Sequence, residues 1–144
     1  MKQDTAIKII CTLLAFLFAY AAVSKLLDYN TFRVQLSQSP YITGFANVIA
    51  LALPVVELTV AVSFVFSNLR LYAFYTALFL LSLFTAYLVA MLNFSYYIPC
   101  SCGGLLSSLS WSQHIVFNIV FMILSLTGIR LSVIEKVPKK YIAL

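Results

Sequence analysis

Four long apolar runs are the feature of this sequence that most constrains its fold. They lie at about residues 6–23, 45–66, 71–92 and 114–131, and a helix needs about 20 mostly apolar residues to cross the hydrocarbon core of a membrane. With 63% hydrophobic and 9% charged residues, the chain has too few charges to cover a surface that faces water. The runs therefore predict an all-α membrane protein, in which residues 1–144 form one domain built as a bundle of four transmembrane helices.

The first run has a second interpretation, as a signal peptide. A basic start and the sequence "AYA" at residues 19–21 fit such a segment. The run is long for a signal peptide, however, and Asp4 weakens its basic start. We favour a transmembrane helix that stays in the protein.

The lysines and arginines predict how the helices cross the membrane. They are scattered at the ends of the apolar runs instead of gathered with aromatic residues in a patch, which argues against nucleic acid as a partner. Four crossings place both termini and the short link "SNLR" on one side with seven basic residues, and leave Lys25 and Arg33 on the other. Cytoplasmic loops carry the excess of Lys and Arg, so we expect a bacterial inner membrane protein with both termini in the cytoplasm. The seven residues are Lys2, Lys8, Arg70, Arg130, Lys136, Lys139 and Lys140.

The most polar segment, "SKLLDYNTFRVQLSQSP", follows the first run. Asn30 or Thr31 can cap a short helix there, Phe32 and Leu36 share one face of it, and Pro40 ends it. We predict that this short interfacial helix lies in the first outer loop, at the membrane surface.

Cys100 and Cys102 are the strongest candidates for chemistry. They lie in the second outer loop, in "YIPCSCGG", on the side of the membrane where an oxidising compartment permits disulfides. A bridge across one intervening residue closes a small ring, and strained bridges are easily reduced, which favours an exchanging redox pair. A structural bridge and a metal site remain alternatives, although few other metal ligands lie nearby. The third cysteine, Cys11, is expected to behave as a small buried hydrophobe.

His114, the only histidine, begins the fourth run. The preceding "SWSQ" is a capping box with Ser110 as N-cap and Gln113 at N3, so His114 falls in the first helical turn on the cysteine side. A histidine there can take a proton from a thiol or stabilise a thiolate, and Asn118, one turn further, can orient its ring. The alternative is an interfacial histidine bonded to a loop carbonyl.

Glu57 is a carboxyl group in the middle of the second run. Ionisable groups at that depth usually face the interior of a bundle and mark a functional site. Glu57 can pair with Lys25 if that side chain reaches inward, and Pro54, one turn earlier, frees a backbone carbonyl for the same polar cluster. The alternative is a neutral glutamate that joins helices by hydrogen bonds.

Four segments, taken in order along the chain, carry a family resemblance. "SKLLDYNTFRVQLSQSP", "LPVVEL", "PCSCGG" and "SWSQHIVFNIVF" resemble the MauE branch of the DoxX-like membrane proteins, over nearly the whole chain. The resemblance implies a four-helix bundle that acts in protein maturation for methylamine utilisation, beside an extracytoplasmic thioredoxin-like protein. Gly103 and Gly104 stand where many members carry an aromatic residue. The positions that match the family are Lys25, Asp28, Pro54, Glu57, Cys100, Cys102 and His114.

These features support three hypotheses for the function. The leading one is a membrane component of thiol–disulfide exchange, in which Cys100 and Cys102 react with a periplasmic thioredoxin-like partner and His114 and Glu57 assist. No cofactor is required by the sequence. A quinone is an open candidate, because vitamin K epoxide reductase passes electrons from thiols to a quinone through a four-helix bundle. The alternatives are a scaffold or chaperone with a permanent disulfide, and a small transporter or metal-handling protein.

Overall fold

The helices that cross the membrane form two pairs. The structure is a computed structural model that describes residues 2–94 and 110–136. In these residues the elements are α1 (Lys2–Leu27), α2 (Tyr29–Gln38), a 3-10 turn η1 (Thr43–Phe45), α3 (Ala46–Ser63), α4 (Arg70–Phe94) and α5 (Trp111–Lys136). All of these elements except α2 belong to four segments long and apolar enough to cross a membrane, which confirms the predicted all-α bundle.

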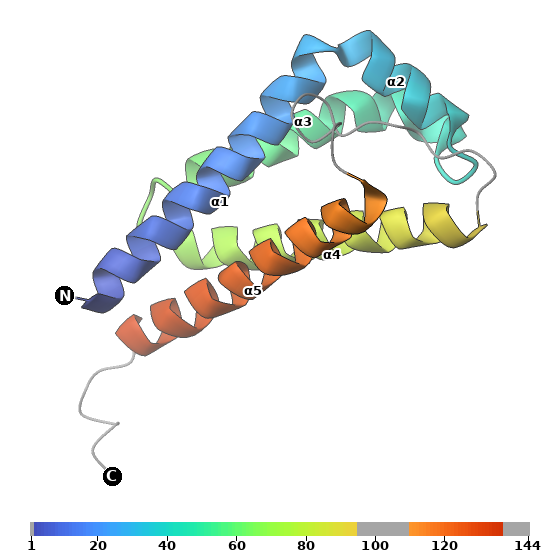
Figure 1. Cartoon of the computed structure of the whole chain (residues 1–144). Helices are drawn as coiled ribbons and strands as arrows, with labels where there is room; N and C mark the ends of the chain where they lie inside the picture. The colour runs from blue at the N-terminus through green and yellow to red at the C-terminus, as the bar shows by residue number, and fades with distance from the viewer. Residues whose placement is uncertain (1, 95–109, 137–144) are drawn as a thin grey trace.

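The two pairs are α1 with α3 and α4 with α5, as Figure 1 shows. A turn at residues 64–69 joins α3 to α4 as a hairpin, but these two helices pack less extensively on each other than on their pair partners. From that turn the pairs diverge toward the end of the bundle that carries α2 (Figure 1). We call this end the α2 end, and the opposite end, where α1 begins and α5 stops, the terminal end.

Apolar residues lie on both the buried and the exposed faces of the long helices, and the buried residues are recognised by their helical spacing. On α1, Leu14, Phe18, Ala22 and Lys25 form one buried stripe at intervals of three and four residues. On α5 the buried stripe is polar or small, and it consists of His114, Asn118, Ser125, Gly128 and Ser132. Such residues at helix contacts are typical of membrane proteins, in which the lipid is as apolar as the core.

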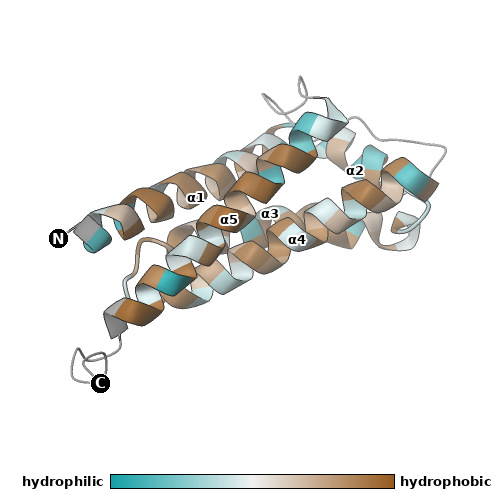
Figure 2. Ribbon diagram, turned by 60° about the horizontal axis from the view of Figure 1, so that its bottom comes forward, coloured by the Kyte–Doolittle hydropathy of each residue, from teal (hydrophilic) through white to brown (hydrophobic). Residues whose placement is uncertain are grey.

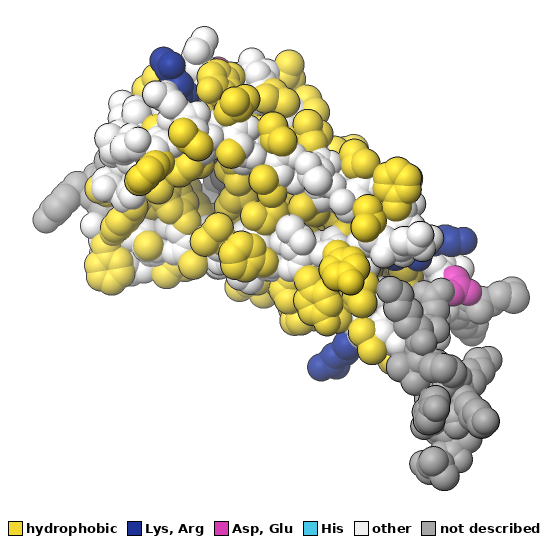
Figure 3. Space-filling model, turned by 180° about the vertical axis from the view of Figure 1, so that it is seen from behind, with side chains coloured by type: hydrophobic (Ala, Val, Ile, Leu, Met, Phe, Trp, Pro, Cys, Tyr) yellow, Lys and Arg dark blue, Asp and Glu magenta, His cyan; other side chains and the backbone are white. Residues whose placement is uncertain are grey.

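Large apolar side chains accordingly cover the outside of the helices. Figure 3 shows them over most of one face, with Lys and Arg only toward its two ends, and Figure 2 shows the same apolar middle along the ribbons. Phe16, Phe79 and Val116 are examples, each 60–72% exposed. A surface of this kind suits contact with acyl chains.

A dense apolar core fills the part of the bundle toward the terminal end, and we call this part the closed half. It joins α1, α3 and α4 through buried side chains that include Leu14, Val60 and Ala77. The rings of Phe64 and Phe74 meet edge to face with centroids 5.1 Å apart. Cys11 lies in this core at 6% exposure, in agreement with its predicted role as a small hydrophobe.

The short helix α2 lies against α3 rather than standing apart from the bundle. Phe32 and Leu36 are buried on Ala46 and Ala50 of α3, as their shared face predicted. The predicted cap is wrong: the helix starts at Tyr29 after Asp28, so Asn30 and Thr31 lie inside its first turn. Its C-cap is Ser39, the residue before Pro40, because a residue before proline avoids the helical conformation.

Candidate functional site

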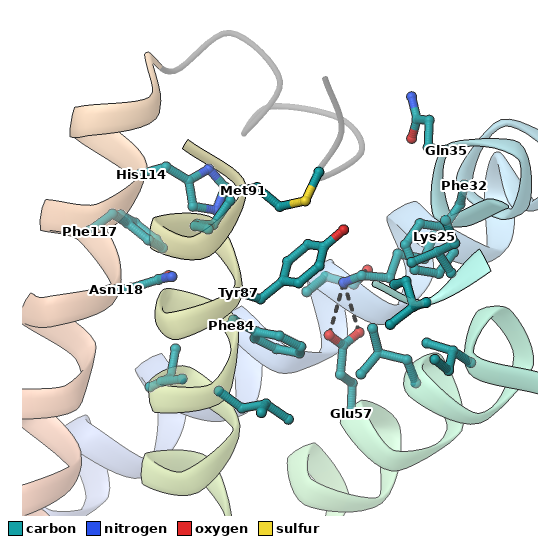
Figure 4. Close-up of a pocket in the computed structure, with 18 of the residues that line it drawn as sticks. Lys25, Phe32, Gln35, Glu57, Phe84, Tyr87, Met91, His114, Phe117 and Asn118 are labelled. Atoms are coloured by element: carbon teal, nitrogen blue, oxygen red, sulfur yellow. Dashed lines mark hydrogen bonds and ion pairs between the residues drawn. The ribbon is translucent and has the colours of Figure 1, made fainter. Parts of the chain in front are cut away.

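A cavity of about 320 Å³ lies between the two helix pairs at the α2 end. Side chains of α1, α2, α3, α4 and α5 line it, and most of them are apolar or aromatic. We call this part of the molecule the open half. Its polar lining residues are Lys25, Gln35, Glu57, Tyr87, His114 and Asn118, several of which Figure 4 shows pointing toward one another.

Lys25 and Glu57 form an ion pair in the wall of this cavity. The Lys25 ammonium donates hydrogen bonds to Glu57 Oε1 at 2.8 Å and to Oε2 at 3.0 Å (Figure 4). Glu57 is fully buried and Lys25 is 9% exposed. The sequence predicted this pairing on condition that Lys25 reaches inward, and it does so because Lys25 continues the buried stripe of α1.

The surroundings of the Lys25 ammonium use all its hydrogen-bonding capacity. A third bond, of 3.3 Å, goes to the carbonyl oxygen of Ala21 in the preceding turn of α1. The rings of Phe32 and Phe84 each have their centroid 5.9 Å from the nitrogen, which adds cation–π attraction. The pair therefore links α1 to α3 and offers no spare donor on the lysine.

His114 and Asn118 face the cavity from α5, on the side of Figure 4 opposite the ion pair. The predicted capping box before them is confirmed: the Ser110 amide donates to Gln113 Oε1 at 2.9 Å, and the Gln113 amide donates to Ser110 Oγ at 3.4 Å. His114 is 6% exposed and Asn118 is 5% exposed. Within the described ranges 2–94 and 110–136 neither side chain has a hydrogen-bond partner, and neither is among the fully enclosed unpartnered groups, so the polar atoms of both are open to the cavity that they line.

A hydrogen bond between α4 and the end of α2 spans the open half. The Tyr87 hydroxyl donates to Ser39 Oγ at 3.0 Å, and Ser39, which is fully buried, lies 3.7 Å from the sulfur of Met91. Sequence reasoning missed both Tyr87 and Ser39. Tyr87 shares a helix face with Phe84 and Met91, and a phenol on that face was the available signal, whereas Ser39 lies in an irregular segment with no periodicity to assign it.

Comparison with known proteins identifies the family. Residues 3–131 match the family model described as Methylamine utilisation protein MauE. The chain belongs to the MauE family. No curated protein and no solved structure matches it. Family membership and the four candidate spans together make it a multi-pass membrane protein of methylamine utilisation.

The MauE match, over residues 3–131, takes in residues of all four long helices and the loop that carries the cysteines. The DoxX-like grouping and the thioredoxin-like partner stay predictions. Cys100 and Cys102 lie outside the described residues. On either side of their loop, Leu92 of α4 and Trp111 of α5 line the cavity.

The remaining predicted site residues lie away from the cavity. Asp28 is exposed at the N-cap of α2, where the chain leaves helical geometry with φ of −118° and ψ of 49°. Pro54 is buried in α3 but does not line the cavity. In the part of the chain that the structure describes, no three His, Cys, Asp or Glu side chains gather as a metal site would require.

Proposed function

We propose that this MauE protein is a membrane component of thiol–disulfide exchange, with Cys100 and Cys102 as the reacting pair. The observation that carries the proposal is the position of their loop in the chain. It joins two helix ends whose residues line one cavity, in a family of methylamine utilisation proteins. Both ends of the cysteine loop are therefore helices whose side chains line the open half.

The reaction is an exchange between two cysteine pairs. A thiolate of a periplasmic thioredoxin-like partner attacks the Cys100–Cys102 disulfide, and a mixed disulfide forms. The second thiolate of the partner then attacks the partner sulfur of the mixed disulfide. The partner leaves with its own disulfide, and both MauE cysteines become thiols. His114, with its ring in the cavity, holds or passes a proton in these steps, while Lys25 and Glu57 join the helices beneath.

The α2 end faces the oxidising compartment in this proposal, with both termini in the cytoplasm. More basic residues of the described ranges lie toward the terminal end, among them Lys8, Arg70 and Arg130, than toward the α2 end, which supports that orientation. Labelling of intact cells with a thiol reagent that cannot cross membranes tests it. Cys100 and Cys102 should react after mild reduction, and a protein in which only Cys11 remains should not.

Trapping of the partner tests the exchange itself. Cys102→Ala leaves Cys100 to hold a mixed disulfide, and it should accumulate a covalent complex that reductant releases. The matched control is Cys11→Ala, which should trap nothing and should support oxidation of the partner as the unchanged protein does. If variants that lack both Cys100 and Cys102 still oxidise the partner normally, the proposal is wrong.

A second function, a scaffold with a permanent disulfide, is favoured by one observation. The Lys25–Glu57 pair has no spare lysine donor, as expected for a group that only holds helices together. The reduction potential of the cysteine pair separates the two functions. A value below about −300 mV indicates a structural bridge, and a higher value indicates an exchanging one.

A further inference from the structure

His114 and Asn118 are polar side chains that the described residues leave without hydrogen bonds. Each is at least nine-tenths buried, yet each lines the cavity, and they lie one turn apart on the same face of α5 (Figure 4). A buried polar group without a partner costs about 1–3 kcal/mol, so groups of this kind usually meet a ligand or an ordered molecule. The imidazole and the carboxamide can each donate and accept, so together they suit an oxygen that is a carbonyl in one state and a hydroxyl in another.

The rest of the cavity suits an apolar ring. Its volume of about 320 Å³ is near the lower end of roughly 300–1,000 Å³ for small-molecule sites, which is space for a single ring system. Phe84, Phe117 and Trp111 are aromatic residues of its lining. The Lys25 ammonium is already saturated by Glu57 and Ala21, so the ligand needs no formal charge.

The cavity also reaches the surface that faces lipid. Leu83 of α4 lines the cavity and is 51% exposed among the apolar side chains on the outside of the bundle. Leu83 lies on α4, and α4 diverges from α3 toward the α2 end (Figure 1). A ligand dissolved in the bilayer can therefore enter between these helices with its tail left in the membrane.

We propose that the open half binds the ring of a quinone, with one carbonyl oxygen held by His114 and Asn118. This inference rests on the proposed function, for which the quinone is the electron acceptor. When two cysteine thiols form a disulfide, they release an electron pair and two protons. The quinone takes up the electron pair and the two protons and becomes a quinol, whose hydroxyl then donates to the same two side chains.

The single tryptophan of the chain provides the measurement, because Trp111 lines the cavity. The full chain in nanodiscs is titrated with a short-tailed ubiquinone analogue while tryptophan emission is recorded. Binding should quench Trp111 with a saturable curve. A free tryptophan derivative in empty nanodiscs corrects for collisional quenching.

Variants of the two polar residues separate specific binding from partition into the cavity. Asn118→Leu and His114→Ala should each weaken binding about tenfold, since each removes a hydrogen bond to a buried ligand. His114→Gln keeps a donor and an acceptor and should stay within about threefold of the unchanged protein. Asn93→Leu is the matched control, because Asn93 is exposed, is not among the residues that line the cavity and donates to a carbonyl of its own helix. Thermal unfolding of each variant identifies any that misfold.

Two results would overturn the proposal. One is quenching that never saturates, or quenching that is the same in Asn118→Leu and His114→Ala as in the control Asn93→Leu. The other is equal competition by an alkylbenzene without carbonyl groups, which would make the cavity a site for acyl chains.

The same titration of a Cys100→Ala, Cys102→Ala double variant distinguishes this proposal from the thiol–disulfide function. Quinone binding requires neither cysteine and should persist in that variant. Saturable quenching without partner trapping supports the quinone site alone. Trapping without saturable quenching leaves the exchange in place and overturns the quinone site.

Discussion

The closed half and the open half of the bundle are built from the same four long helices but differ in how their interiors are filled. In the closed half, α1, α3 and α4 meet through apolar side chains with Phe74 fully buried among them. In the open half, the helix pairs diverge around a cavity that contains a buried ion pair and two polar side chains of α5. The comparison indicates that the closed half holds the helices together, so that the open half can keep space for a ligand.

Removal of the Glu57 carboxylate should have the largest effect on stability. Glu57→Gln leaves the Lys25 ammonium buried at 9% exposure without its anion, and breaking a buried pair in this way costs about 3–5 kcal/mol. The midpoint of unfolding by SDS in mixed micelles measures the loss.

Two further variants show whether that loss comes from the pair. Lys25→Met with Glu57→Leu should recover most of the stability, because an apolar pair leaves no unpaired charge. Asp28→Asn alters an exposed carboxyl outside the cavity and should change the free energy of unfolding by less than about 0.5 kcal/mol. A double variant as unstable as Glu57→Gln would mean that the open half needs the charges themselves.

The second test compares the packing of the two halves. In each half one alanine is replaced by leucine, which adds the same three carbon atoms. Ala77 is fully buried in the core of the closed half, whereas Ala21 lines the cavity. Ala77→Leu should cost about 3 kcal/mol because a packed core has no room for the added atoms, and Ala21→Leu should stay within about 1 kcal/mol. Thermal unfolding of the two variants side by side measures the difference, and equal losses would contradict the division into halves.

Spacing along the helices made much of this arrangement predictable. The apolar runs indicated the four spans. The pair of Lys25 and Glu57 was predicted on the condition that Lys25 reaches inward, and the helical interval from Ala22 to Lys25 meets that condition. The capping box was equally local, because Ser110 and Gln113 are three residues apart. Predictions of this type succeed when the interacting groups are close in the sequence.

Other features depend on contacts that no local pattern contains. The two helices α3 and α4 each pack more extensively on another helix than on one another, and they diverge around the cavity (Figure 1). Tyr87 and Ser39 are 48 residues apart in the sequence, and only the fold brings them together. Asp28 was named as a site position from the family resemblance alone, but the chain leaves helical geometry at Asp28, and its exposed side chain is not part of the cavity lining.

Gly128 in the closed half tests how closely α5 approaches α4. A Cβ at Gly128 would overlap the ring of Phe74, whereas a Cβ at Gly44 would meet nothing within 4 Å. Gly128→Ala should therefore cost about 1–2 kcal/mol through overpacking, despite the better helix propensity of alanine. Gly44→Ala is the control and should leave the thermal midpoint nearly unchanged. In a Phe74→Leu background the added cost of Gly128→Ala should shrink, and an undiminished cost would exclude contact with Phe74 as its cause.

The hydrogen bond between Tyr87 and Ser39 should account for the smallest effect, and it is the one that reports on the open half alone. Tyr87→Phe removes the donor to a fully buried hydroxyl, which should cost about 1 kcal/mol. Since the bond ties the end of α2 to α4, amide hydrogen exchange should quicken in residues 29–38 and stay constant in the closed half. Tyr72→Phe, at a ring that is 69% exposed, is the matched control and should alter neither. Faster exchange along α1 and α4 in the closed half would show instead that the two halves unfold as one unit.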